Sequence, residues 1–278
     1  MAARDLLHPS DLELLDVEIA DDGRSGRFVL APGLVRHDGA LYGGTGLAVS
    51  VLAMQAASGR DVLWTTTQFI SSPRLGAEIE WTVDVLAEGK RATQLRVEAT
   101  CAGAVAFTAL GTAGVSSEDG LTGQYRTMPE ANDPESCAAW GAMRGSVAPD
   151  SWIQKIDLRD AQLLQPTASS SAMWVRRQDR RPMTPVAIAF AADFVPLGVA
   201  RAAGKQGAGS SLDNSMRFRP GEGTEWVLLE LEGEFASGGY GHGNVLAWGQ
   251  DGTLLGSGSQ TAAMRYLSDP GEPWRLPG

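Results

Sequence analysis

Cysteine and histidine are scarce in this sequence. Its 278 residues include two cysteines, Cys101 and Cys137, and three histidines, at positions 8, 37 and 242. Two cysteines can form at most one disulfide, and the absence of Cys-x-x-Cys spacing makes reduced, structural thiols the expectation. No two histidines have the spacing of zinc ligands. The sequence therefore predicts neither a disulfide framework nor a metal site.

Positive charge is also in short supply. Lysine and arginine number 23 against 33 acidic residues, which gives a net charge of −10. Because no basic stripe of the kind that binds phosphate backbones is present, we expect neither nucleic acid nor a membrane surface as a partner. The densest basic run joins Arg176-Arg177 to Arg180-Arg181. It predicts a solvated strand end, with an anion site as the alternative.

Long purely apolar runs are missing. The N-terminus has no run long enough for a signal-peptide core, which favours a cytoplasmic protein. Residues 39–59 carry no charge over a length that could span a bilayer, but they include five glycines and four polar residues. This leaves too little apolar surface for a transmembrane segment. We expect instead a helix that is buried on nearly all sides.

The residues after this segment alternate as β-strands do. From Glu78 to Val85 every second residue is apolar, and the alternation resumes from Thr93 to Cys101 after a turn at 88–90. A further apolar run covers residues 105–110. This pattern indicates an antiparallel meander with one buried face.

The second half repeats the pattern. Thr184-Pro185 is a good helix start, with Thr as N-cap and Pro at the first helical position, and a strand run begins at Glu225-Trp226. The helix starts are 184 − 44 = 140 residues apart, and the tryptophans 226 − 81 = 145 apart. The repeat predicts an α+β chain of two fused units, each with one long buried helix and a meander.

The repeat also predicts the domain organisation. The units are expected at residues 1–115 and 151–278. Between them, residues 116–150 are rich in Gly, Pro, Ser and acidic residues without a sustained period, as in a connector that runs over the surface. The sheet edges that such a pair leaves exposed favour a homo-oligomer, for example a dimer.

Several stretches outside the connector share an order and spacing with a known family. They are residues 41–49 (Leu-Tyr-Gly-Gly-Thr-Gly-Leu-Ala-Val), 69–73 (Phe-Ile-Ser-Ser-Pro), 211–216 (Ser-Leu-Asp-Asn-Ser-Met), 225–229 (Glu-Trp-Val-Leu-Leu), 236–239 (Ala-Ser-Gly-Gly) and 259–261 (Ser-Gln-Thr). No single motif is specific, but in order and spacing, over most of the chain, they resemble the acyl-CoA thioesterase II family, whose fold is the double hotdog.

The resemblance implies hydrolysis of an acyl-CoA thioester to free acid and CoA by a water that the protein activates, with no cofactor or metal. In that family an Asp, a Gln and a Thr hold the water. The Asp falls on Asp213 and the Gln on Gln260, whereas the Thr position falls on Glu234, a departure. Glu234 could share a proton with Asp213. Alternatively, Glu234 points to solvent and Ser237 supplies the hydroxyl, or the activity is weak or lost.

The chemistry of thioester hydrolysis needs the same kinds of groups. Asp213 can accept the proton of the water, the Gln260 amide can orient it, and the N–H groups of Gly43 and Gly44 can stabilise the oxyanion. Each also has a structural interpretation: a solvated carboxylate, a buried amide, and glycines that permit tight helix packing. Asp193, a lone carboxylate in an apolar helix, is interpreted as a helix-end hydrogen-bond acceptor near Pro196.

The first repeat has Thr66 to Gln68 where the second has Asp213, so one site per chain, between the units, is expected. His37 followed by Asp38 is a weak echo of the His and acid pair of hotdog dehydratases. The rival function is a silent double hotdog that binds an acyl ligand without hydrolysing it.

Overall fold

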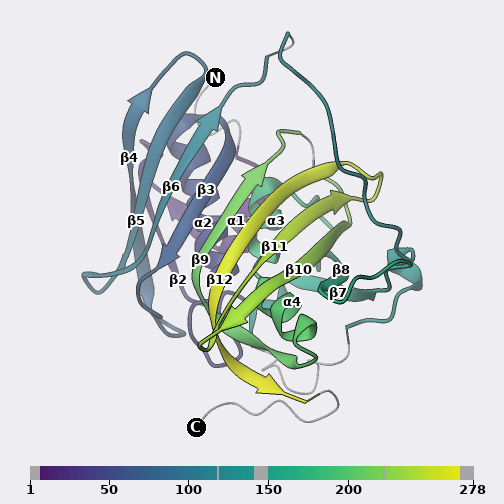
Figure 1. Cartoon of the computed structure of the whole chain (residues 1–278). Coiled ribbons are helices and arrows are strands. Elements are labelled where there is room, and N and C mark those ends of the chain that lie inside the picture. The colour runs from purple at the N-terminus through teal and green to yellow at the C-terminus, as the bar shows by residue number, and fades with distance from the viewer. Residues whose placement is uncertain (1–6, 118, 141–149, 222, 270–278) are drawn as a thin grey trace.

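One antiparallel sheet of twelve strands crosses the whole molecule (Figure 1). The computed structural model describes residues 7–117, 119–140, 150–221 and 223–269. In Figure 1 the main helices lie together behind the sheet, so the sheet wraps them from one side. The strand order is β1-β2-β4-β5-β6-β3-β9-β12-β11-β10-β8-β7. Its two halves correspond strand by strand when one is reversed, which confirms the double hotdog.

The N-terminal unit supplies the first six strands and the helix that they cover. The expected charge-free helix and the meander after it are both present. The elements are α1 (Pro9–Leu15), β1 (Val17–Ile19), β2 (Ser25–Val29), α2 (Gly43–Ser58), β3 (Asp61–Phe69), β4 (Glu78–Glu88), β5 (Ala92–Cys101) and β6 (Ala104–Gly114).

The C-terminal unit repeats this order after the connector. Its elements are η2 (Pro134–Ser136), η3 (Trp152–Gln154), β7 (Ile156–Ala161), β8 (Ser170–Arg177), α3 (Pro185–Ala191), α4 (Val195–Ala202), β9 (Gln206–Phe218), β10 (Val227–Ser237), β11 (Tyr240–Gly249) and β12 (Leu254–Ser268).

The central helix α2 is the most enclosed element of the fold. Its residues are buried up to Ala56, as its lack of charge predicts. It ends at Gly59, which takes the left-handed conformation (φ 63°) that glycine adopts without strain. No side chain caps its N-terminus at Tyr42. The first N–H groups of α2 therefore need partners from elsewhere in the fold.

The second central helix is interrupted. Thr184 caps α3 as expected, its hydroxyl accepting from the N–H of Ala187 at 3.2 Å. The prediction of one long helix is wrong, because α3 ends at Ala191 and α4 begins at Val195. Pro196 suits the first turn of a new helix better than the interior of a continuous one. The break places Asp193 between the two helices.

Only one described helical segment, residues 185–202, is long and apolar enough to cross a membrane. This segment comprises α3, the break and α4. Some 78% of it is buried inside the fold, as in the core helix of a folded domain.

The two units share one core. Strand β3 pairs with β9 from Trp64↔Arg217 to Gln68↔Asp213, which joins the half-sheets, and α2 packs against α3. Trp81 and Trp226, which the repeat in the sequence aligned, do not occupy equivalent positions. Trp81 lies in the shared core, and Trp226 lies in a separate cluster on the other side of the sheet. Because the core is continuous, groups from both units meet beside α2.

The connector packs against the C-terminal unit. The indole of Trp174 donates to the carbonyl of Asn132 at 2.8 Å, and Cys137 is buried in the cluster that contains Trp226. Further along, Trp140 enters the shared core and contacts the ring of Phe194 edge-on, with ring centroids 6.4 Å apart. The connector thus contributes an aromatic side chain to the interior.

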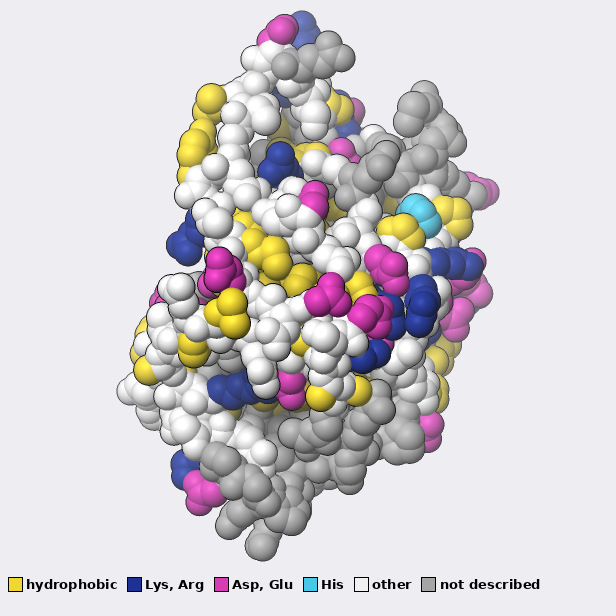
Figure 2. Space-filling model, turned by 90° about the vertical axis from the view of Figure 1, so that its right-hand side faces the viewer, with side chains coloured by type: hydrophobic (Ala, Val, Ile, Leu, Met, Phe, Trp, Pro, Cys, Tyr) yellow, Lys and Arg dark blue, Asp and Glu magenta, His cyan; other side chains and the backbone are white. Residues whose placement is uncertain are grey.

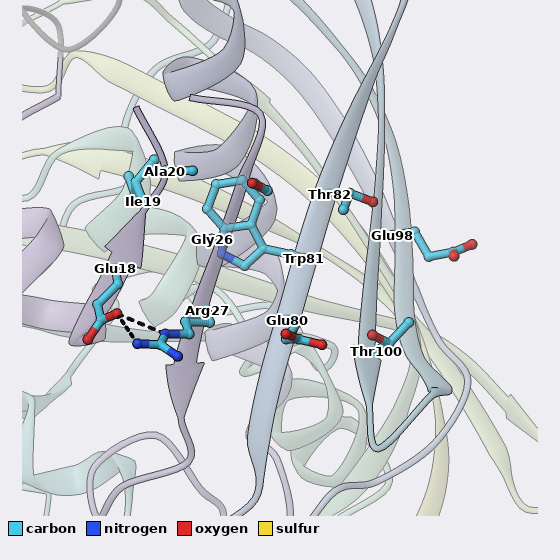
Figure 3. A pocket seen from close by; sticks show the side chains of 11 residues that line it. Glu18, Ile19, Ala20, Gly26, Arg27, Glu80, Trp81, Thr82, Glu98 and Thr100 are labelled. Carbon is cyan, nitrogen blue, oxygen red and sulfur yellow. Dashed lines mark hydrogen bonds and ion pairs between the residues drawn. The ribbon is translucent and has the colours of Figure 1, made fainter. Parts of the chain in front are cut away.

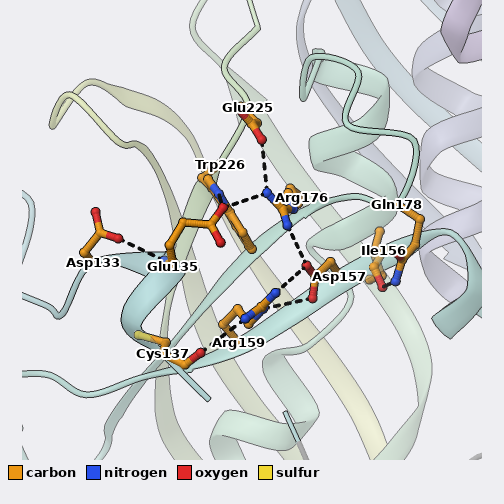
Figure 4. Close-up of polar contacts among 10 residues, drawn as sticks. All are labelled: Asp133, Glu135, Cys137, Ile156, Asp157, Arg159, Arg176, Gln178, Glu225 and Trp226. Atoms are coloured by element: carbon orange, nitrogen blue, oxygen red, sulfur yellow. Dashed lines mark hydrogen bonds and ion pairs between the residues drawn. The ribbon is translucent and has the colours of Figure 1, made fainter. Parts of the chain in front are cut away.

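Arg176 holds the connector through charge (Figure 4). Its guanidinium pairs with Glu135 of the connector (2.9 Å), Asp157 (3.1 Å) and Glu225 (3.1 Å), and stacks over Trp226 at 4.2 Å from the ring centroid. Because only 4% of the side chain is exposed, Arg176 is no solvated strand end. That prediction was wrong, since three acidic partners neutralise the residue in place.

Arg177 is buried on the other face of β8, with 1% exposure. It donates to the carbonyl of Ser10 at 2.9 Å and pairs with Asp11 (3.4 Å) and Asp179 (2.6 Å), which ties α1 to the C-terminal unit. Figure 2 views the molecule from the side on which β7 and β8 lie, and its basic side chains lie among acidic ones. The alternative of an anion site at residues 176–181, which would have suited the CoA phosphates, is therefore not supported.

Candidate active site

The carboxylate of Asp193 is a point of convergence between the two units. It accepts hydrogen bonds from the N–H of Gly44 (3.0 Å), Ser211 Oγ (3.0 Å), Asn214 Nδ2 (3.3 Å) and Gln260 Nε2. Three of these donors reach Oδ1, whereas the Gly44 N–H is the one donor among the described residues that reaches Oδ2. A carboxylate has about four lone-pair directions over its two oxygens, so Oδ2 keeps acceptor capacity.

Two glycines make this convergence geometrically feasible. A Cβ on Gly43 would lie 2.5 Å from Asp193 Oδ2 and 2.8 Å from Ser211 Oγ, and one on Gly44 would lie 2.1 Å from the carbonyl oxygen of Phe190. Any side chain at either position would push α2 away from α3. The glycines therefore allow both tight helix packing and direct access to the start of α2, where the helix dipole favours negative charge.

Gln260 faces the same site from β12. It pairs with Asn214 of β9 and Gly243 of β11, and a Cβ on Gly243 would lie 3.1 Å from Val195 of α4. Gln260 and Asn214 thus point to the helix side of the sheet, and both are fully buried. Among the described residues, neither Gln260 Oε1 nor Asn214 Oδ1 has a hydrogen-bond partner. Two buried acceptors beside Asp193 remain available to a ligand or water.

Burial raises the pKa of Asp193 above its usual value, and the hydrogen bonds from Ser211, Gln260, Asn214 and Gly44 act against the shift. The charged form loses solvation in the interior, and the four donors replace only part of it. A carboxylate with a raised pKa is a stronger base than an ordinary one.

Asp213 lies on the opposite face of the sheet from Gln260. It pairs with Thr261, whose N–H it accepts at 3.0 Å, and Thr261 pairs with His242. Cross-strand partners share a face, and successive residues alternate. The hydroxyl of Thr261 lies 3.1 Å from Nδ1 of His242, whose Nε2 is 3.9 Å from Glu234.

Asp213, Thr261, His242 and Glu234 form a second polar cluster on the face of the sheet away from Asp193. Two of its members, Asp213 and Glu234, were assigned by resemblance. Glu234 is exposed and hydrogen-bonds to Asn244. Ser237 lies exposed at the end of the β10–β11 hairpin, paired with Tyr240. The structure thus brings Gln260, Gly43 and Gly44 together around Asp193, and groups Asp213 and Glu234 through Thr261 and His242. The catalytic assignments of Asp213, Gln260 and Glu234 and the substrate contacts of Gly43, Gly44 and Ser237 remain predictions.

A cavity of about 50 Å³ opens beside Asp193. Aromatic side chains dominate its walls: Tyr42 stacks on Trp152 (5.3 Å between centroids), and Trp152 meets Phe194 edge-on (5.1 Å). On another wall, Arg36 pairs with Asp38 at 2.8 Å. The remaining lining residues include His37, Trp140, Pro196, Leu197 and Gly207 to Gly209. A cavity of this size can hold water next to the buried carboxylate, but it is much smaller than the roughly 300–1,000 Å³ of a typical ligand pocket.

Family profiles match both units of the chain. The acyl-CoA thioesterase N-terminal domain matches residues 33–114, and the acyl-CoA thioesterase C-terminal domain matches residues 132–264. The chain belongs to the acyl-CoA thioesterase family. This thioesterase is thus a thioester hydrolase by family, with an acyl-CoA as the implied substrate.

Solved structures show the same fold. A candidate thioesterase of Novosphingobium aromaticivorans is 27% identical, with a TM-score of 0.81 over 89% of this chain and 98% of that one. An acyl-CoA thioesterase II of Mycobacterium marinum is 24% identical, with a TM-score of 0.72 over 92% and 98%. The tesB protein of Mycobacterium avium subspecies paratuberculosis is 20% identical, with a TM-score of 0.73 over 92% and 98%. A search of curated proteins found no match.

Asp193 is the residue of this thioesterase that sequence reasoning undervalued. It was interpreted as a helix-end acceptor within its own segment, but it accepts from the start of the helix of the other unit. A signal was present, since Asp193 is the lone charged residue in the apolar stretch 186–195. A buried charge must be paired or hydrogen-bonded, and the partners come from three other elements.

A larger groove of about 560 Å³ lies across β1, β2, β4 and β5, beside Trp81 (Figure 3). Glu18, Glu80 and Glu98 line it, and its one basic side chain, Arg27, pairs with Glu18 at 2.8 Å. The groove carries excess negative charge, so it is a poor site for the anionic CoA ester.

Proposed function

We propose that this thioesterase hydrolyses acyl-CoA at the N-terminus of α2, with Asp193 as the base. The contact between Gln260 and Asp193 carries the proposal, because it joins the glutamine that the family resemblance assigns to the water with a buried carboxylate of raised pKa. Aspartate as acceptor and glutamine as orienting amide are the groups that direct attack of water on a thioester needs.

The proposed reaction uses the free acceptor capacity of the site. A water donates one hydrogen to Asp193 Oδ2 and the other to Gln260 Oε1, and its oxygen attacks the carbonyl carbon. Asp193 takes the first proton as the C–O bond forms. The tetrahedral oxyanion then collapses, the C–S bond breaks, and the CoA sulfur leaves with the pair of electrons and receives the proton from Asp193. The product is a free acid.

The resemblance alone assigns the water to Asp213 instead. We favour Asp193, because Asp213 lies on the other face of the sheet from Gln260 and its Oδ1 is occupied by the N–H of Thr261. The matched variants Asp193→Asn and Asp213→Asn distinguish the two carboxylates. The silent binding protein is the alternative function, and it requires that no acyl-CoA be hydrolysed.

Replacement of Gln260 by Ala is expected to lower kcat about 10²-fold with a much smaller change in KM. The amide orients the water rather than the substrate, so its loss affects turnover more than binding. CoA release from acyl-CoAs of two to sixteen carbons, followed with a thiol reagent, measures both constants. Equal losses in kcat and in apparent affinity would contradict the water-positioning role. No release by the wild type at any chain length would favour the silent binder.

The raised pKa of Asp193 predicts a specific acid limb in the pH profile. The base must be deprotonated, so kcat/KM is expected to fall as the pH drops through a pKa above the 3.8 of an ordinary aspartate. The profile of kcat/KM between pH 4 and 9 tests this. An acid limb at or below the ordinary value would show that the base is not a buried carboxylate.

The dimer and the cytoplasmic location remain predictions. Size-exclusion chromatography with light scattering measures the oligomeric state directly. The domain limits at 115 and 151 also remain predictions.

A further inference from the structure

Tyr42 is a buried side chain that the proposed reaction has not yet used. It stands at the N-cap position of α2, immediately before Gly43 and Gly44, and only 3% of it is exposed. The hydroxyl end of its ring packs directly against Gly44. A Cβ on Gly44 would lie 2.4 Å from Cε1 and 2.9 Å from Cζ of Tyr42. The phenol carbon that carries the hydroxyl therefore lies against the residue whose N–H binds Asp193.

The hydroxyl of Tyr42 has no hydrogen-bond partner among the described residues. Buried hydroxyls are nearly always paired, because an unpaired one loses its solvation without compensation. A phenylalanine would fill the same space without this cost. The hydroxyl is therefore best explained by a partner that arrives with the substrate.

Aromatic packing fixes the ring. Tyr42 stacks on Trp152 at 5.3 Å with 21° between the planes, and meets Phe190 edge-on at 5.2 Å. Both Tyr42 and Asp193 line the same cavity. A donor held in place before the reaction costs no reorganisation when charge develops, which is the requirement for stabilising an oxyanion.

The proton of Tyr42 stays on the phenol. Burial first, and then the negative charge of Asp193, raise the pKa of Tyr42 well above its ordinary value. Tyr42 therefore acts as a donor throughout the working range of pH. Asp193 already accepts from four groups and no bond between the two residues is present, so this proton is available to a further acceptor.

We propose that the Tyr42 hydroxyl donates a hydrogen bond to the carbonyl oxygen of the thioester and to the oxyanion that forms from it. The N–H of Gly43 is the complementary donor, since it has no backbone partner among the described residues. The inference rests on the proposed hydrolysis at Asp193. Asp193 acts on the attacking water, and Tyr42 stabilises the carbonyl oxygen of the thioester.

The test is Tyr42→Phe in the full chain. Loss of one preorganised donor is expected to lower kcat about 10²-fold, with KM changed less than about threefold. Tyr125→Phe is the matched control, because the same atom is removed from a side chain that is 85% exposed, and it should keep wild-type constants. Unchanged kcat in Tyr42→Phe, or a change in KM alone, would overturn the proposal.

A binding measurement separates a donor from a structural role. Two inert CoA analogues are compared by calorimetry, a methylene ketone that keeps the carbonyl and a thioether that lacks it. Tyr42→Phe should weaken the ketone about tenfold and leave the thioether unchanged. Equal effects on both analogues, or a clear drop in thermal stability of the variant, would show a packing role instead.

The same experiments distinguish this inference from the proposed function. If the wild type releases CoA and Tyr42→Phe is equally active, only the role of Tyr42 fails. If the wild type releases no CoA from any substrate, the proposed hydrolysis fails, and the role of Tyr42 fails with it.

Discussion

Asp193→Asn is expected to lower kcat by about 10²- to 10⁴-fold, the range that a general base contributes. Asparagine keeps the size of the side chain and the acceptor that faces Ser211, Asn214 and Gln260, but it cannot take a proton. The substrate should still bind, so the loss should fall on kcat. Steady-state CoA release by the wild type and the variant, with circular dichroism to verify folding, measures the effect.

Asp213→Asn is the matched control, and it makes the same chemical change on the other face of the sheet. If Asp193 is the base, this variant should retain kcat within about threefold of the wild type, because it can still accept from the N–H of Thr261. The reverse pattern, with Asp213→Asn inactive and Asp193→Asn active, would assign the base to Asp213 as the family resemblance implies.

Arg177→Met is expected to destabilise the fold by about 3–5 kcal/mol, the cost of removing one partner from a buried ion pair. Methionine fills much of the volume, but it removes the cation that pairs with Asp11 in the first turn of α1 and leaves Thr184 as the close donor to this carboxylate, at 2.8 Å. Urea denaturation at pH 7 measures the loss. Arg181→Met is the control, because its pair with Glu13 is exposed at the surface and contributes about 1 kcal/mol at most.

The deficit of Arg177→Met should also depend on pH. Burial raises the pKa of Asp11, and Arg177 is one of the groups that lower it, so the variant raises that pKa further. A carboxyl whose folded pKa exceeds its unfolded value destabilises the fold as pH rises through that interval. The deficit should therefore be smaller at pH 4 than at pH 7. A deficit independent of pH would place the cost in packing rather than in the charge of Asp11.

The periodicity of the sequence predicted most of the helices and strands of the fold. The charge-free segment that became α2, the alternation in β4 and β5, and the Thr-Pro start of α3 are local signals that agree with the final structure. They are reliable because the spacing of apolar residues within a strand or helix shows which face it buries. The resemblance to the thioesterase family then fixed the class of reaction.

The break between α3 and α4 was harder to predict. Pro196 allows a helix break nearby, but it does not show at which residue the first helix ends. The apolar stretch also continues past Ala191, so no change in pattern marks the break. Only the packing of α2 against α3 shows that Asp193 leaves the helix to bind Gly44. The burial of Arg176 and Arg177 was equally hard to predict. Most of their acidic partners come from distant parts of the chain, namely the connector, α1 and neighbouring strands, and no local sequence pattern indicates these contacts.

The sequence by itself determined that this chain is an α+β protein of two fused units, because secondary structure and repeats depend on local periodicity. Its resemblance to the thioesterase family then implied the hotdog fold. Only the tertiary structure decided which carboxylate meets Gln260. That choice depends on the register of β9 against β12 and on the approach of two helices permitted by Gly43 and Gly44. A shift of one residue in a strand exchanges its faces, so residues adjacent in sequence, such as Asp213 and Asn214, lie on opposite sides of the sheet.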